Sequence, residues 1–77
     1  MVNIGQDIKE ELQRQERTVS WLARKLNCNR AAVYRMMQKN SIDTGMLQSV
    51  SIALKRNFFE PLERETTQKL NNFKTEV

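Results

Sequence analysis

The 77-residue sequence contains no histidine, one cysteine, one proline and two glycines. Without histidine, and with a single cysteine, one chain cannot build the common tetrahedral zinc sites. The same absence excludes Ser–His and Cys–His nucleophilic catalysis. The sequence also has no Gly-rich phosphate-binding loop. We therefore expect no enzyme activity and no bound metal or cofactor.

Long apolar runs are also missing. The longest uninterrupted one is only a few residues, and the N-terminus lacks the apolar stretch of a secretory signal. Cys28 has no disulfide partner within the chain, which fits a reducing compartment. We expect a cytoplasmic protein with no membrane contact, in which Cys28 points inward as a structural thiol.

Acidic residues occur in two close pairs, Glu10 with Glu11 and Glu63 with Glu65. Paired carboxylates can perform general acid–base chemistry when they face each other. Helical residues one or two positions apart point in different directions, however. We therefore expect both pairs to lie on solvated helix faces.

Basic residues are concentrated in the middle of the chain. Between Arg17 and Arg56 there are eight Lys and Arg residues and one acidic residue, Asp43, a net charge of +7. The segments outside this range carry five basic and eight acidic residues, a net charge of −3. Such clustering is the footprint expected for phosphate contact, although a solubilising basic surface is an equal alternative.

Few glycines and prolines, with apolar residues at helical spacing, predict an all-α single domain. We expect helices over 4–15, 19–26, 30–38 and 44–55, and a short fifth helix near 58–62. Four residues suit the N-cap positions: Asn3, Thr18, Asn29 and Asp43. Asn57 can end the fourth helix in a left-handed conformation.

The segment 22–36 is the most informative part of the sequence. Leu22 and Leu26 share one face of a helix, and Val33 and Met36 share one face of the next. Asn27 lies between them, where a sharp turn needs a residue that tolerates positive φ. This layout predicts a helix-turn-helix, a unit that most often places its second helix in the DNA major groove.

Trp21 does not fall on the apolar stripe of its helix. It is therefore either partly exposed or covered by another segment, such as the C-terminal tail.

From Ile4 to about Leu62 the chain resembles the lambda-repressor-like (XRE-type) helix-turn-helix family of small bacterial and phage regulators. The residues that carry the resemblance are Thr18, Leu22-Ala23, Leu26, Cys28, Val33, Met36, Ile42-Asp43, Leu47 and Ala53-Leu54. One departure is Asn27, which stands where the family usually has glycine. The resemblance implies a compact five-helix bundle over residues 1–62, followed by a polar tail over 63–77 that is helical or frayed.

The resemblance also implies positions for DNA contacts. Base edges would be met by the start and outward face of the third helix, at Asn29, Arg30, Ala31, Tyr34 and Arg35. Phosphates would be met by the start of the second helix and the loop before the fourth, at Thr18, Val19, Lys39, Asn40 and Thr44. The alternatives are that the two arginines are only solvated charges and that Tyr34 covers a neighbouring apolar patch.

One such module has a small footprint on DNA, so specificity usually needs two copies on half-sites about 34 Å apart. We expect a homodimer on a pseudo-palindromic operator in double-stranded DNA, acting as a repressor by steric exclusion. The candidate dimer contacts are Phe58, Phe59, Leu62, Leu70 and Phe73. The alternatives are an antitoxin-type module whose tail binds a protein partner, and a structural domain without DNA affinity.

Overall fold

The computed structural model describes residues 2–39 and 41–76, and over these residues it is helical without strands. The elements in chain order are α1 (Ile4–Arg14), α2 (Val19–Lys25), α3 (Arg30–Met37), α4 (Thr44–Leu54) and α5 (Phe59–Glu76). The predicted all-α class is confirmed. No helix in the described ranges is long and apolar enough to span a membrane.

The first four helices begin where the sequence predicts. Each N-cap side-chain oxygen accepts a hydrogen bond from the backbone N–H three residues later, at 2.8 to 3.0 Å. The four caps are Asn3, Thr18, Asn29 and Asp43. Each cap satisfies one of the N–H groups that the first turn leaves without a helical partner.

The ends of the helices are less regular, because no glycine is available to stop them. Glu16, Asn27 and Lys55 all adopt the left-handed conformation, with φ of 55° or 56°. The prediction for Asn27 is confirmed. The prediction that Asn57 ends α4 is wrong, since Lys55 fills that role and Asn57 instead accepts a hydrogen bond from the N–H of Phe59 at 3.0 Å.

The core lies between the first four helices, which pack around one continuous apolar cluster. Phe58, in the link that leads to α5, is 1% exposed and closes this cluster. The buried apolar residues are Ile4, Ile8, Leu12, Leu22, Ala23, Val33, Met36, Leu47, Val50, Leu54 and Phe58. Because these residues recur at helical spacing, their burial fixes which face of each helix points outward.

Gly5 brings the start of α1 against the end of α3. Its N–H donates a hydrogen bond to the carbonyl oxygen of Lys39 at 3.1 Å. A Cβ at this position would overlap with the carbonyl oxygens of Met37 and Lys39. The close approach of these two backbones therefore requires glycine.

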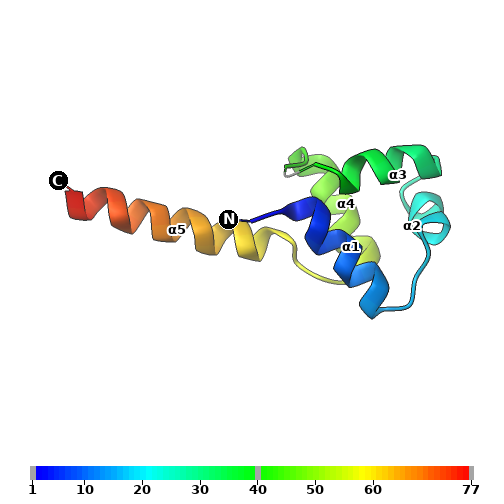
Figure 1. Ribbon diagram of the computed structural model, residues 1–77, viewed down its shortest axis with the longest axis horizontal. Helices are drawn as coiled ribbons and strands as arrows, with labels where there is room; N and C mark the ends of the chain where they lie inside the picture. Colours follow the sequence, from blue (N-terminus) through cyan, green and yellow to red (C-terminus); the bar gives the residue numbers. More distant parts are fainter. Residues whose placement is uncertain (1, 40, 77) are drawn as a thin grey trace.

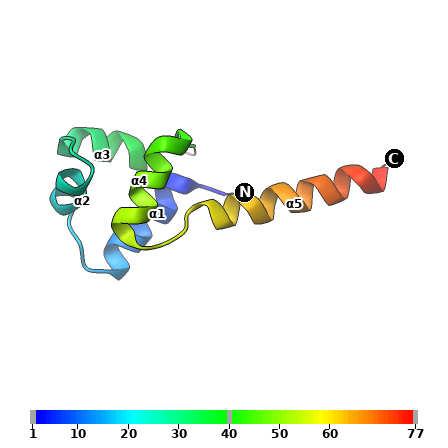
Figure 2. The same cartoon turned by 180° about the vertical axis from the view of Figure 1, so that it is seen from behind.

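Helix α5 is longer than predicted and projects from the body formed by the other helices (Figures 1 and 2). Its first turns lie against the body, where Phe59 and Leu62 are half-buried and the N–H of Val2 donates to Glu65 Oε2 at 3.1 Å. The expected tail over 63–77 continues this helix without a break as far as Glu76. The second half of α5 extends into solvent (Figure 1).

Candidate nucleic-acid interface

The α2–α3 pair is joined by only four residues, 26–29. Asn27 turns the chain in its left-handed conformation, and the N–H of Cys28 donates to the carbonyl oxygen of Ala23 at 3.0 Å. Cys28 is half-buried and packs against the core, as expected for a structural thiol. Asn29 then begins α3, so the direction of the second helix is fixed by local hydrogen bonds.

The inner faces of α2 and α3 are buried against each other and against the rest of the core. Leu22 and Val33 are at most 1% exposed, and Ala23 and Met36 are at most 7% exposed. The small side chain of Ala23 lets the two helices approach closely. With these faces buried, the opposite face of α3 points to solvent.

The outward face of α3 carries the predicted base-contacting residues. Arg30, Ala31, Tyr34 and Arg35 are all exposed, and Tyr34 is 53% exposed. They lie at positions i, i+1, i+4 and i+5, which share one side of a helix. The Oδ1 atom of Asn29 is already engaged by the N–H of Ala32 at 2.8 Å, so a base contact there would use the rest of its amide group.

The predicted phosphate-contacting residues lie at helix starts and in the loop after α3. Thr18 and Thr44 are exposed at the starts of α2 and α4, and Lys39 is exposed in the loop. Val19 is half-buried and packs against the core, which leaves its backbone rather than its side chain for a contact. Asn40 lies outside the described residues.

Two of these basic side chains come together in space. Arg35, from the outward face of α3, and Lys39, from the following loop, line one hollow of about 380 Å³ with Asp43. Its apolar wall includes Cys28 and Met46. The structure therefore joins a predicted base-contacting residue to a predicted phosphate-contacting residue on one surface.

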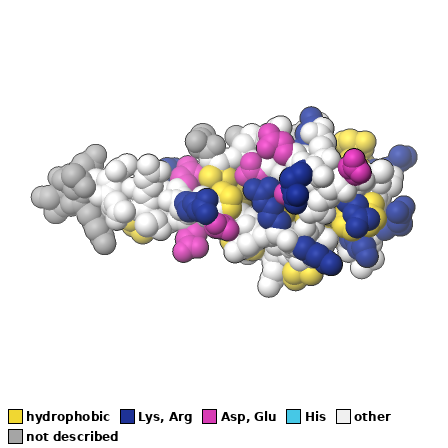
Figure 3. Space-filling model, turned by 90° about the horizontal axis from the view of Figure 1, so that it is seen from below, with side chains coloured by type: hydrophobic (Ala, Val, Ile, Leu, Met, Phe, Trp, Pro, Cys, Tyr) yellow, Lys and Arg dark blue, Asp and Glu magenta, His cyan; other side chains and the backbone are white. Residues whose placement is uncertain are grey.

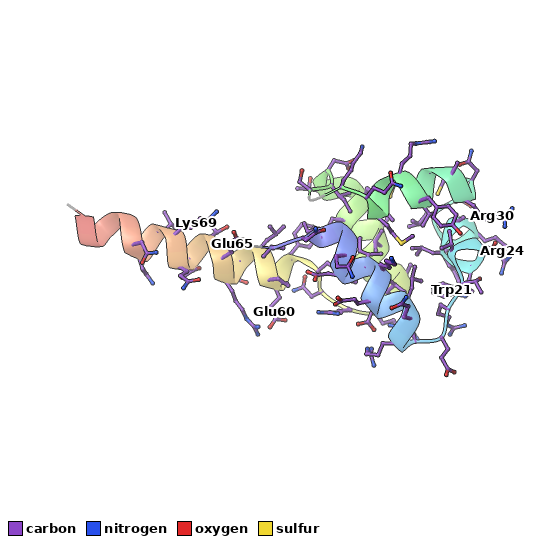
Figure 4. The ribbon with its side chains drawn as sticks, in the orientation of Figure 1. Trp21, Arg24, Arg30, Glu60, Glu65 and Lys69 are labelled. Carbon is purple, nitrogen blue, oxygen red and sulfur yellow. The ribbon has the colours of Figure 1, made fainter. Side chains whose placement is uncertain are left out.

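The basic surface is concentrated at the end of the body that carries α2 and α3. Figure 3 shows several Lys and Arg side chains over this end, and acidic side chains near the start of α5 and over the middle of the body, with one at this end. Arg24 and Arg30 lie at the end remote from α5 (Figure 4). Arg24 was absent from the predicted contacts, although the apolar stripe through Leu22 and Leu26 already indicated that it faces outward; the structure has Leu22 and Ala23 buried and Arg24 exposed.

Most of these cations are uncommitted. Within the described part of the chain, no ion pair involves the exposed basic residues Arg24, Lys25, Arg30, Arg35 and Lys39. Arg56 differs, because its Nη1 atom lies 2.8 Å from Glu11 Oε1. The positive electrostatic potential at this end of the molecule can therefore attract an anionic partner.

The prediction that Glu11 belongs to a solvated face is wrong. Its side chain is 1% exposed and accepts hydrogen bonds from Arg14, from Gln15 at 2.7 Å and from Arg56 at 2.8 Å. Burial alone would raise the pKa of Glu11. These donors, with Arg14 the strongest, instead lower its pKa from 4.5 to about 2.

The Glu11 cluster holds the body together rather than binding a ligand. Gln15 Nε2 also donates to the carbonyl oxygen of Leu54 at 2.8 Å, so α1 is tied to the end of α4. In the described residues no buried side-chain polar atom is left without a hydrogen-bond partner. Glu11 lies three residues after Ile8 and seven after Ile4, so helical spacing already places it on the apolar face of α1. Its pairing with Arg56 could not be predicted, because the two residues are 45 positions apart.

The candidate dimer residues differ in exposure. Phe58 is buried in the core of the single chain, so its ring has no surface for a second copy. Phe59 and Leu62 are half-buried, and Leu70 is 55% exposed on the projecting part of α5. The side chain of Phe73 lies outside the described part of the chain.

Acidic and sulfur-containing side chains do not converge into a metal site. Among residues 2–39 and 41–72, no group of three or more His, Cys, Asp or Glu side chains could hold a metal ion. The polar side chains that do lie together are the cations and hydrogen-bonding groups on the exposed face of α3. Comparison with protein-family models, curated proteins and solved structures finds no match to this chain.

Proposed function

We propose that this chain is a sequence-specific DNA-binding regulator of the helix-turn-helix type. The observation that carries the proposal is the outward face of α3. It presents Arg30, Ala31, Tyr34 and Arg35 to solvent, and neither arginine is held by an acidic side chain in the described residues. A short, rigidly capped helix with such a face suits the DNA major groove.

Each side chain on this face has a chemical counterpart on a base pair or phosphate. Arg30 and Arg35 can donate two hydrogen bonds to guanine O6 and N7, and each such pair discriminates by roughly 1–3 kcal/mol. The methyl group of Ala31 can pack on a thymine methyl. The Tyr34 hydroxyl can donate to a phosphate.

Phosphate contacts would fix the register of α3 in the groove. Lys39 lies beside Arg35, and Thr18 and Thr44 offer hydroxyl groups at helix starts. Contacts of this kind add affinity but carry no sequence information. The exposed positions of Thr18, Lys39 and Thr44 support the lambda-repressor-like assignment of residues 4–62, which we also propose.

The regulator acts as a homodimer on a pseudo-palindromic operator and represses by occupying it. A single α3 reads few base pairs, so two copies on successive turns of DNA supply the needed specificity. Leu70, exposed on α5, is the described apolar side chain best placed for contact with a second copy.

One observation favours a second candidate function. Helix α5 runs for 18 residues and its second half leaves the body (Figure 1). A short polar helical segment that projects from the body is marginal in water, because it lacks the packing that stabilises most helices in proteins. A protein-interaction module of the antitoxin type, with α5 as its binding segment, accounts for this projection.

Selection of bound duplexes from a random DNA pool, at low and at moderate salt, tests the first function. We expect an enriched palindrome whose half-sites are about one helical turn apart. Arg30→Ala and Arg35→Ala should each weaken binding to that operator and relax preference at one base pair. Arg64→Ala is the matched control, because Arg64 is exposed on α5 and pairs only locally with Glu60.

Two results would contradict the proposal. Unpatterned binding that falls steeply with salt would reduce the role of α3 to a basic surface. Unchanged base preference in both α3 variants would remove these arginines from sequence recognition, and the protein-partner function would then be favoured.

A further inference from the structure

A groove separate from the α3 face surrounds Trp21. It is an open hollow of about 690 Å³ between the end of α1, α2 and the second half of α4. Trp21, Ile52 and Ala53 form its apolar part, and Arg17, Lys25 and Lys55 stand around it. We call it the Trp21 groove; its lining includes residues of α2 and α4 but none of α3.

The apolar part of this groove is unusually open to water. Ile52 is 72% exposed, and it is one of three large apolar side chains exposed in the described residues. Trp21 is only half-buried, although it packs against the core. Isolated exposed apolar residues need no explanation, but Ile52 and Trp21 line one hollow and so offer apolar surface to the same occupant.

Two of the three cations around the groove, Arg17 and Lys25, lie over the tryptophan ring. The Arg17 guanidinium carbon lies 4.6 Å from the ring centroid, and the Lys25 ammonium nitrogen lies 5.8 Å from it. Cation–π attraction of this kind orders charges without neutralising them. The part of α5 with described side chains, residues 59–72, does not cover the ring, contrary to one sequence-based expectation, since none of these residues lines the groove.

No acidic residue lines the groove. Arg17, Lys25 and Lys55 also take part in no ion pair within the described part of the chain. An apolar floor with a positive border is complementary to an acidic segment that carries one apolar anchor. Figure 3 shows this combination of hydrophobic and basic surface at the end of the body away from α5.

We propose that the Trp21 groove is a docking site for an acidic segment of a partner protein, with an aliphatic or aromatic side chain of that segment seated against Trp21 and Ile52. The anchor removes the exposed apolar surface from water, and Asp or Glu residues beside it meet Arg17, Lys25 and Lys55. A DNA backbone would satisfy the cations but would leave Ile52 against charged phosphates. No residue of α3 lines the groove, so a partner bound there would leave the outward face of α3 free. The proposal therefore does not rest on the function proposed for α3.

The test uses the full chain and a displayed library of short random peptides. We expect the enriched peptides to combine Asp or Glu residues with an aliphatic or aromatic residue. A labelled peptide of this kind should bind saturably by fluorescence anisotropy. It should also shift the emission of Trp21, the one tryptophan in the chain.

Two groove variants and two matched controls locate the site. Ile52→Ser and Lys25→Gln should each weaken peptide binding by about tenfold or more. Leu70→Ser, a change of an exposed apolar residue on α5, and Lys39→Gln, a lysine change in the loop after α3, should leave it unaltered. All four side chains are exposed, and circular dichroism checks that every variant retains its helices.

Several outcomes would overturn the proposal. These are a selection that enriches no acidic peptides, peptides that bind Ile52→Ser as tightly as the parent, and peptides that leave Trp21 emission unchanged. A short DNA duplex is the remaining probe. The protein-docking proposal fails if the duplex shifts Trp21 emission and if duplex binding is weakened by Lys25→Gln but not by Ile52→Ser. The groove would then be a contact for DNA phosphates.

Discussion

Replacing Glu11 by glutamine should destabilise the fold far more than its position in the sequence suggests. Glu11 is 1% exposed and accepts hydrogen bonds from Arg14, Gln15 and Arg56. Glutamine has the same shape but places a neutral amide among these donors, and its own NH₂ group cannot accept from them. The charge-assisted bonds that link α1 to the segment after α4 would be lost.

The pKa of Glu11 sets the size of the effect. Its decrease from 4.5 to about 2 favours the ionised folded state by roughly 3 kcal/mol. Arg14 and Arg56 are 71% and 44% exposed, so both can turn to water when the carboxylate is removed. We therefore expect a loss of roughly 3 kcal/mol, at the lower end of the range for breaking a buried ion pair.

Such a loss is large for a chain of 77 residues, whose total stability should be about 4–12 kcal/mol. The midpoint of thermal unfolding should fall by roughly 10–20 °C. Unfolding followed by circular dichroism at 222 nm measures it directly. The matched control is Glu10→Gln, because Glu10 is exposed and accepts only from the Gln6 side chain.

The effect should also depend on pH in a defined direction. Because the folded-state pKa lies below the unfolded value, the stability from Glu11 is fully present above about pH 5. It is lost as the pH falls from 4.5 towards 2. The difference between parent and Glu11→Gln should therefore shrink over this window. Equal stability of the Glu10→Gln and Glu11→Gln variants at pH 7, or a difference that does not vary with pH, would refute the reasoning.

Four further substitutions test the packing and the turns by the same unfolding assay. Gly5→Ala should destabilise by about 1–3 kcal/mol, because the new Cβ meets the carbonyl oxygen of Lys39; a neutral effect would show that α1 can shift away from α3. Lys55→Gly should stabilise by roughly 1 kcal/mol, since Lys55 has φ of 55°. Asn27→Gly should gain less because asparagine tolerates this region, so equal gains would contradict the strain argument. Leu22→Ala should cost about 2–5 kcal/mol because Leu22 is 0% exposed, and an unfolding midpoint close to that of the parent would place Leu22 outside the core.

The starts of the helices were predictable because an N-cap is a local interaction. Asn3, Thr18, Asn29 and Asp43 each bond to a backbone N–H three residues away, so neighbouring sequence is enough to identify them. The turn at Asn27 was predictable for the same reason. The end of α4 was not, because a lysine in the left-handed conformation has no compositional signal and Asn57 was the better candidate by type.

Long-range contacts account for the other differences. Glu11 is buried and bonded to Arg14, Gln15 and Arg56, whereas Glu10 is exposed. Arg56 is 45 positions later in the chain, and no pattern of neighbouring residues predicts that contact. The requirement for glycine at position 5 is also a long-range effect, because a Cβ there would overlap with the carbonyl groups at the end of α3. Trp21 falls off the stripe of its helix, and the groove around it exists only because α4 brings Ile52 alongside.

The amino-acid order was therefore sufficient for the all-α class, for four N-caps and for the outward face of α3, since these follow from helical periodicity and from hydrogen bonds within a single turn. Tertiary packing decided that the Glu11 carboxylate meets Arg56, where α1 and α3 touch, and which apolar side chains stay open beside Trp21. The physical reason is the separation in sequence between the residues that interact. Local hydrogen bonds join residues a few positions apart, whereas burial and desolvation depend on helices that the sequence keeps far apart.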